Sequence, residues 1–304
     1  MEQDGSAIMR QVAFDLSALS RLFSPTVFRQ MAEKGRSPLY ARLLASSGLL
    51  EQGGRPCTVS ASFDIAFGAL RKTGHRSEYV YKSALTQNIL LGRHSLNTAS
   101  LLTEFRAGAS KADVAILNGT STVYEIKSER DTLGRLANQL QDYRKVFAKI
   151  YVIAADPFVD QILRSTEQDV GVMSLVRWDR VKTVREAQDR ADAVCSLTIF
   201  DSLRLDEALA ILSNFGITPP DLPNTRIRAA LRESFSTLPP RSVHDQMVKV
   251  LKSARSLASL GSLVDQVPFS LKPAVLSTSI RPADHSRLIR ALKTPTEQAL
   301  EWTF

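Results

Sequence analysis

Two acidic residues and a lysine have the residue types and spacing that metal-assisted phosphodiester hydrolysis requires. Asp113 precedes Glu125 by twelve positions, and Lys127 stands two positions after Glu125. Carboxylate oxygens are preferred ligands of hard divalent cations, so we expect Asp113 and Glu125 to bind Mg²⁺ or Mn²⁺. Such an ion lowers the pKa of a bound water and stabilises charge on a phosphate. We expect Lys127 to orient that water or to hold the phosphate as a compact positive charge.

Two predicted strands, residues 111–117 and 122–127, must position these side chains. Because side chains alternate along a strand, Glu125 and Lys127 share one face, and Tyr124 and Ile126 take the other. An acid and a lysine on the exposed face of a hairpin are usually only solvated, and this spacing also occurs by chance. The order of the surrounding elements is what favours the catalytic interpretation.

The loop between the two strands decides whether Asp113 and Glu125 can share an ion. Asn118-Gly119 favours a two-residue type I′ turn, which would put Glu125 on the face opposite Asp113. A shared site therefore requires a loop of odd length or a bulge. We expect a three-residue loop of residues 117–119 with Gly119 left-handed, which pairs Asp113 with Val123 and leaves Asp113 diagonal to Glu125.

Two further glutamates are candidate metal ligands. Glu78 begins a predicted helix over residues 78–91, and Glu104 lies in a predicted strand over residues 100–106. We favour Glu104, because its strand neighbours the strand of Asp113. Each residue also has an ordinary explanation: an acid in a first helical turn complements the helix dipole, and Glu104 suits a solvent-facing strand position.

The helix predicted after the second strand adds a polar pair and is surrounded by basic residues. Gln139 and Tyr143 are four positions apart and therefore share a helix face. The pair resembles the Q-x-x-x-Y element of RecB-type nucleases, which implies contact with nucleic acid near the metal; alternatively, Tyr143 belongs to the core and Gln139 flanks it. We expect the nearby basic residues to contact a phosphate backbone; they are Lys111, Arg130, Arg135, Arg144 and Lys145. A further basic group on one predicted C-terminal helix could contact DNA, although a charge run is more often a solvated face; it consists of Arg226, Arg228 and Arg232.

Three segments of different texture follow one another along the chain. Residues 1–57 are predicted to be helical, with a helix starting at Ser24-Pro25 and a linker near residues 52–56. Residues 58–195 alternate helices and strands, and Asp131 is expected to cap the helix after Lys127. The order helix, three strands, helix, strand predicts an α/β fold with a restriction-endonuclease-like core. Residues 196–304 are predicted to be a mainly helical C-terminal region.

Composition favours a nucleic-acid partner and disfavours a membrane protein. The 304 residues carry a formal net charge of +8 and a pI near 9.6, which attracts polyanions. The two cysteines, Cys57 and Cys195, suggest neither a disulfide framework nor a metal site. The polar N-terminus lacks the apolar segment of a signal peptide, and no apolar run approaches the length of a membrane span, so we expect a cytoplasmic protein.

Four short runs of sequence resemble the sce7726 family of bacterial proteins; they are residues 21–24, 78–82, 91–98 and 124–131. This resemblance implies a bacterial or phage origin and says little about activity. The core also resembles the wider PD-(D/E)xK superfamily, which implies nuclease chemistry at Asp113, Glu125 and Lys127. Ala112 stands where that pattern has a proline.

The sequence therefore predicts a metal-dependent nuclease with DNA as the expected substrate, and RNA is left open. The alternative is a catalytically silent module for binding nucleic acid or protein on the same fold. Intact Asp113, Glu125 and Lys127 argue against loss of the site.

Overall fold

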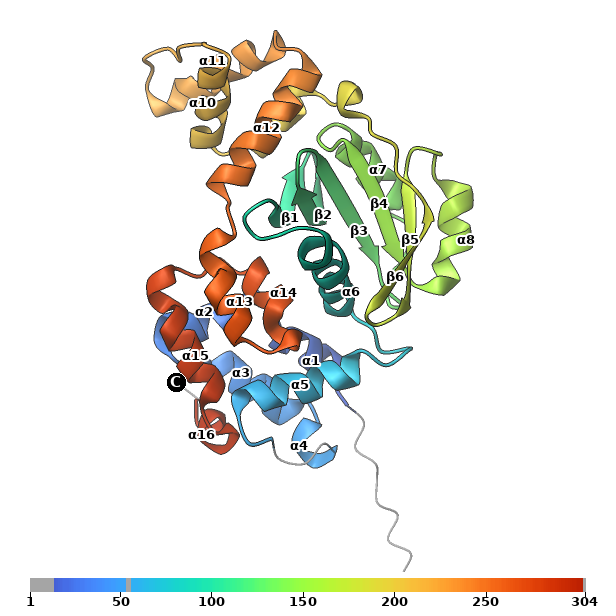
Figure 1. Cartoon of the computed structure of the whole chain (residues 1–304), viewed down its shortest axis with the longest axis vertical. Helices are drawn as coiled ribbons and strands as arrows, with labels where there is room; N and C mark the ends of the chain where they lie inside the picture. The colour runs from blue at the N-terminus through green and yellow to red at the C-terminus, as the bar shows by residue number, and fades with distance from the viewer. Residues whose placement is uncertain (1–13, 53–55, 303–304) are drawn as a thin grey trace, which may run out of the picture. The chain divides into compact units, whose positions relative to one another are not determined.

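The structure is a computed structural model that describes residues 14–52 and 56–302 (Figure 1). Its contacts divide the chain into two compact units, residues 76–265 and a unit built from residues 1–75 with 266–304. The expected divisions at residues 57 and 195 do not coincide with these boundaries. The N-terminal helices share a unit with the last helices of the chain, and the sheet shares a unit with the helices up to residue 265. Most of the expected linker, residues 53–55, lies outside the described residues.

A six-stranded mixed sheet organises the unit of residues 76–265. Its spatial order follows the sequence, and neighbouring strands are antiparallel except for the parallel pairs β3–β4 and β4–β5. The strands are β1 (Ser100–Ala107), β2 (Ser110–Leu117), β3 (Ser121–Lys127), β4 (Lys149–Ala154), β5 (Gly171–Arg177) and β6 (Arg180–Arg185). The mixed α/β class is thereby confirmed.

Helices cover both faces of this sheet (Figure 1). Helix α6 (Glu78–Leu85) contacts β3 and β6, α7 (Leu136–Arg144) contacts β2 and β4, and α8 (Asp156–Ser165) contacts β4 and β5. The apolar core on the α7 side continues into four later helices, which are α9 (Ser196–Ser202), α10 (Leu205–Asn214), α11 (Asn224–Ser236) and α12 (Pro240–Ala254). The continuous apolar run of β4 is buried from Ile150 to Ala154, as expected for a strand covered on both faces.

Several local expectations near the sheet need correction. Asp131 does not cap a helix: its carboxylate accepts hydrogen bonds from the Ser128 amide and hydroxyl, and α7 begins only at Leu136. The helix expected over residues 78–91 is α-helical to Leu85 and continues as a π-helix, Thr86–Leu91. Helix α8 and strand β6 were not predicted; β6 is an edge strand whose residues alternate between exposed and partly buried.

The loop between β2 and β3 has the predicted odd length. Leu117 pairs with Ser121, so residues 118–120 form the loop, and Gly119 has a positive φ of 70°. The three-residue loop and its left-handed glycine are confirmed, but the predicted loop of residues 117–119 is wrong by one position. Because Leu117 remains in the ladder, the register brings Asp113 directly opposite Glu125 rather than opposite Val123.

The other unit is mainly helical among its described residues, with an isolated antiparallel bridge between Thr58 and Pro295. Its helices are α1 (Leu16–Leu22), α2 (Pro25–Lys34), α3 (Pro38–Ser46), α4 (Leu49–Gln52), α5 (Val59–Leu70), α14 (Lys272–Ser277), α15 (His285–Lys293) and α16 (Thr296–Leu300). The predicted helix start at Ser24-Pro25 is confirmed. Tyr40 is fully buried there, bonds to Ser62 at 2.5 Å and packs on Phe63. Short helix α13 (Gly261–Gln266) lies at the boundary between the units. Across the described residues, no helix has the length and apolar character needed to cross a membrane.

Candidate metal centre

The strand ladder opens at one row of acidic residues. The β1–β2 register pairs Thr103 with Val114 and Phe105 with Ala112. Glu104 and Asp113 are therefore opposite each other, but they are not paired in the ladder. The β2–β3 ladder likewise stops at Val114, one position before Asp113 would meet Glu125. Three carboxylate residues thus occupy neighbouring positions on three adjacent strands, where the backbone bonds between strands are interrupted.

Glu104 has the backbone conformation that creates this interruption. Its φ of 52° makes it the non-glycine residue with positive φ in the described chain, and it lies in the middle of a strand. A left-handed conformation costs a residue with a side chain about 1 to 3 kcal/mol and is concentrated at functional sites. The surrounding ladder holds Glu104 in this state, which breaks the regular alternation of β1.

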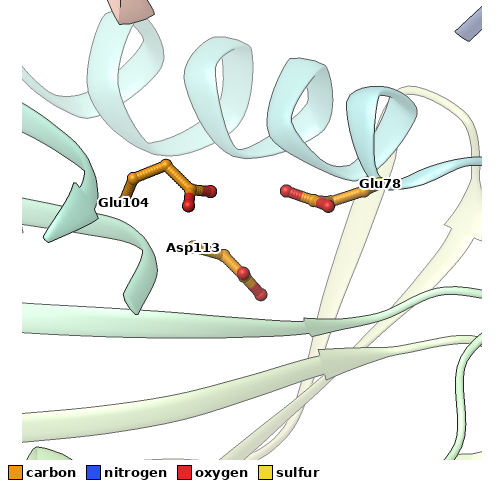
Figure 2. A group of neighbouring side chains, drawn as sticks. All are labelled: Glu78, Glu104 and Asp113. Atoms are coloured by element: carbon orange, nitrogen blue, oxygen red, sulfur yellow. The ribbon is translucent and has the colours of Figure 1, made fainter. Parts of the chain in front are cut away.

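Three carboxylates converge beside helix α6. Ligand oxygens of Glu78, Glu104 and Asp113 all lie within 4.8 Å of one another, and Figure 2 shows Glu78 extending from the helix toward the other two. Glu78 and Glu104 are exposed, whereas Asp113 is partly buried. The set offers only oxygen atoms, which fits a hard cation such as Mg²⁺ or Mn²⁺.

Asp113 is the member of this group whose pKa is clearly raised. Burial, followed by the charges of Glu125 and Glu78, raises the pKa of Asp113 to about 8. The Ile126 amide, which donates to Asp113 at 2.8 Å, and the ammonium group of Lys82 act in the opposite direction. Burial and the neighbouring acids favour the protonated form of this carboxyl group. A bound divalent cation would favour the charged form and so lower the pKa of Asp113.

Glu125 and Lys127 form a separate buried network on the side of α7. The Lys127 ammonium donates to Glu125 at 2.8 Å and to Gln139 at 2.9 Å. The other oxygen of Glu125 accepts a 2.6 Å hydrogen bond from the Tyr143 hydroxyl. Glu125 is 1% exposed and Lys127 is 5% exposed. Both oxygens of Glu125 are therefore engaged with α7 and Lys127 rather than grouped with Asp113, Glu104 and Glu78.

Both residues of the predicted polar pair on α7 contact the buried network of Glu125 and Lys127. Tyr143 is fully buried and also donates to the Lys111 carbonyl at 2.8 Å. Gln139 is half-buried and lines a cleft beside Asp113. Tyr143 is bound to the Glu125 carboxylate in the core, which is the alternative that the sequence left open, whereas Gln139 connects the buried network to the cleft.

That cleft places two of the predicted basic residues, Lys111 and Arg135, beside the acids. It has a volume of about 470 Å³, and its lining residues are Glu104, Ala109, Ser110, Lys111, Asp113, Arg135, Asn138 and Gln139. Lys111 is also 4.0 Å from Glu104. Arg130 is exposed on the loop after β3 and is not among the residues that line the cleft.

The sequence argument missed Lys82. Its ammonium lies 2.6 Å from Glu78 and 3.9 Å from Glu104, with 18% of the side chain exposed. The spacing of four residues from Glu78 was available in the sequence, because residues four apart share a helix face. Lys82 is therefore a second lysine at the site and is more accessible than Lys127.

The fold and the site together define an α/β protein with an acidic cluster at a distorted sheet edge. The family model for bacteriophage P4 protein cII matches residues 71–260, and the chain belongs to this family. The matched range contains the whole sheet and all the candidate site residues. Protein cII of Enterobacteria phage P4 is 25% identical over 232 residues, which are 73% of this chain and 82% of that protein.

These matches correct the family resemblance. The assignments to the sce7726 family and to a PD-(D/E)xK nuclease family are wrong, because the matching family is that of phage P4 protein cII. Short runs and a three-residue active-site pattern carried those assignments, and such patterns recur in unrelated chains. A solved structure of SPO1766, a protein of unknown function from Silicibacter pomeroyi, aligns over 62% of this chain and 94% of its own, with 16% identity. Its TM-score of 0.28 supports no inference.

Proposed function

We propose that this protein is a metal-dependent nuclease that hydrolyses phosphodiester bonds, with DNA as the preferred substrate. In this proposal the helix, three strands, helix and strand from α6 to β4 form a restriction-endonuclease-like core. The observation that carries the proposal is the convergence of Glu78, Glu104 and Asp113 beside a cleft that also contains Lys111 and Arg135. Acidic oxygens for a cation and basic side chains for a phosphate thus lie in one place.

The geometry favours a cation held by Asp113 with Glu104 and Glu78, rather than by Asp113 and Glu125 alone. Glu125 has both oxygens engaged by Lys127 and Tyr143 and would have to exchange a bond to become a ligand. When bound, Mg²⁺ or Mn²⁺ would supply an activated water and charge stabilisation on the phosphate.

The two lysines differ in how they would act. Lys82 is adjacent to the acids and partly exposed, which suits an ammonium group that contacts the scissile phosphate. Lys127 is nearly fully buried and held by Glu125 and Gln139, which suits a positioning role for the strand that carries the Ile126 amide to Asp113. Lys111 and Arg135 would neutralise neighbouring phosphates.

The test measures cleavage of plasmid, linear and single-stranded DNA and of RNA, with Mg²⁺ and with Mn²⁺. Loss of outer residues around a metal site costs about 10- to 100-fold, so Asp113→Asn, which alters a ligand, should reduce cleavage by about 100-fold or more. Glu104→Gln and Lys82→Met should also reduce cleavage strongly. Asp160→Asn, at an exposed aspartate of α8, is the matched control and should cleave as the wild type does.

Binding of Mn²⁺, followed by titration calorimetry, provides a second readout. Wild-type protein and Asp160→Asn should bind the ion, and Asp113→Asn should not. Wild-type protein that binds DNA and shows no cleavage with either ion would favour a catalytically silent binding module. Equal cleavage by Asp113→Asn and the wild type would refute the proposed site.

A further inference from the structure

A second cleft adjoins the one at the metal centre. It has a volume of about 590 Å³, and its lining residues are Arg106, Gly108, Ala109, Asp142, Lys145, Thr198, Asp201 and Arg228. Ala109, in the turn between β1 and β2, lines both clefts. The two clefts therefore meet at this turn, and together they extend from the acidic cluster to the helices α9 and α11.

Two arginines of the second cleft are exposed and donate hydrogen bonds to backbone carbonyls. Arg106 donates through Nε to the Gly108 carbonyl at 3.3 Å. Arg228 donates to the carbonyls of Phe200 and Leu203 at 3.4 and 3.3 Å, and its guanidinium lies 4.8 Å from the centre of the Phe200 ring. Within residues 14–52 and 56–302, neither arginine forms an ion pair with a carboxylate. Because a guanidinium has five N–H donors, each retains donors for an anion.

The two acids in the second cleft are already engaged by other groups. Asp142 accepts hydrogen bonds from the Ser110 hydroxyl at 2.8 Å, the Ala109 amide at 3.2 Å and the Lys145 ammonium at 3.2 Å. Asp201 lies 3.5 Å from Arg232, on the helix that carries Arg228. The unpaired charge that faces this cleft is therefore positive.

The turn between the clefts is held tightly. Gly108 has a φ of 60°, and a Cβ at this position would lie only 2.7 Å from an Asp142 oxygen. The same aspartate accepts the Ala109 amide and the Ser110 hydroxyl, so Asp142 fastens the turn to α7. Arg106 and the metal centre are therefore kept in a fixed relation at the two sides of this turn.

We propose that the second cleft binds phosphates of the polynucleotide strand whose scissile phosphate lies at the metal centre. This inference rests on the proposed nuclease function and specifies its substrate as a continuous strand that crosses the β1–β2 turn, rather than a mononucleotide. Arg106 and Arg228 bind the flanking phosphates, because planar guanidinium groups match phosphate oxygens in a bidentate arrangement.

The experiment measures binding of a labelled 20-nucleotide single strand in EDTA, where no cleavage occurs, over a range of salt concentrations. The slope of log K against log salt is negative. Loss of two phosphate contacts should make it less steep by about 1.4, at about 0.7 per contact. Arg106→Gln combined with Arg228→Gln should also weaken binding by about 10-fold or more at low salt. The matched control is Arg164→Gln with Arg180→Gln, which removes two exposed charges from α8 and β6, away from the β1 edge.

A single change guards against a folding artefact, because Arg228 also packs on Phe200. Arg106→Gln alone should make the slope of log K against log salt less steep by about 0.7. Equal loss of affinity in the control pair would refute the proposal that the second cleft binds phosphates. Unchanged binding in both Arg106 variants would refute it as well.

Cleavage by wild-type protein, measured in parallel with Mg²⁺, separates this inference from the nuclease proposal. If the wild type cleaves DNA and the Arg106 variants bind normally, the nuclease proposal stands and the proposed phosphate binding in the second cleft is refuted. Inactive wild type with weakened binding by these variants, but not by the control, would retain a nucleic-acid site there and remove the nuclease proposal.

Discussion

Replacing Asp113 with asparagine should flatten the dependence of folding stability on pH. The carboxyl group has a pKa raised from 3.8 to about 8 by burial and by the charges of Glu125 and Glu78. The folded state therefore holds this proton more tightly than the unfolded chain does. The stabilisation is fully present below about pH 4 and is lost as the pH rises through about 8. Asparagine has nearly the same shape and no proton to lose.

The size of the effect follows from the shift. Each unit of pKa difference corresponds to about 1.4 kcal/mol, so the three units between pH 5 and pH 8 give an upper value of about 4 kcal/mol. Asp113 lines a cleft, and solvent there relieves part of this cost. We therefore expect wild-type protein to lose about 2 kcal/mol or more over this range relative to Asp113→Asn.

The assay is urea unfolding at pH 5, 6, 7 and 8 in EDTA, with tryptophan fluorescence as the signal. The chain has two tryptophans, Trp178 between β5 and β6 and Trp302 packed 5.8 Å from Tyr40 in the other unit. A Trp302→Phe background makes the signal report the unit that contains the sheet, which matters because two compact units need not unfold together.

The control in this background is Asp160→Asn, at an exposed aspartate of α8. It should retain the pH dependence of the wild type. Parallel pH profiles for wild type and Asp113→Asn, within about 0.5 kcal/mol, would show that Asp113 titrates normally and would refute the electrostatic argument for a cation at this site.

Three further outcomes are expected. At pH 8, Mg²⁺ at 100 times its dissociation constant should stabilise the wild type by about 2.7 kcal/mol and leave Asp113→Asn unchanged in the same urea assay. Glu104→Gly should stabilise the sheet unit by about 1 kcal/mol, because glycine tolerates the positive φ at this position. The same change should weaken Mn²⁺ binding in calorimetry. Glu104→Gln should weaken Mn²⁺ binding without the gain in stability. Tyr143→Phe should destabilise the unit by about 1 to 3 kcal/mol, because buried Glu125 loses a donor, and a change near zero would show that this bond adds no stability.

The sequence predicted the local features that depend on neighbouring residues. The continuous apolar run of β4 located this central strand, because a strand that is covered on both faces buries consecutive residues. The odd loop was predicted from strand alternation together with the assumption that Asp113 and Glu125 share an ion, and the loop of residues 118–120 with its left-handed Gly119 agrees with it. The exact register was missed, since Asn118-Gly119 fits the tip of a three-residue loop in more than one position.

Edge elements were missed where that pattern is weak. Strand β6 alternates only between partly buried and exposed positions, so its sequence has no apolar face to identify it. The division into units was also beyond the sequence, because residues 266–304 share a unit with residues that precede position 76. Contacts between such distant segments depend on how assembled helices pack, and no local period records them.

Tertiary structure alone decided how the candidate site is assembled. The sequence placed Asp113 and Glu125 at the centre of the site and offered Glu78 and Glu104 as further ligands, whereas packing of α6 brings Glu78 and the unpredicted Lys82 to Asp113 from more than 30 residues away. The left-handed backbone of Glu104 turns a strand position toward the same point. Tyr143 meanwhile holds Glu125 on the side of α7. Residue types and spacing therefore determined which side chains were chemically suited to a cation, whereas the interrupted ladder and the helix packing determined which of them meet.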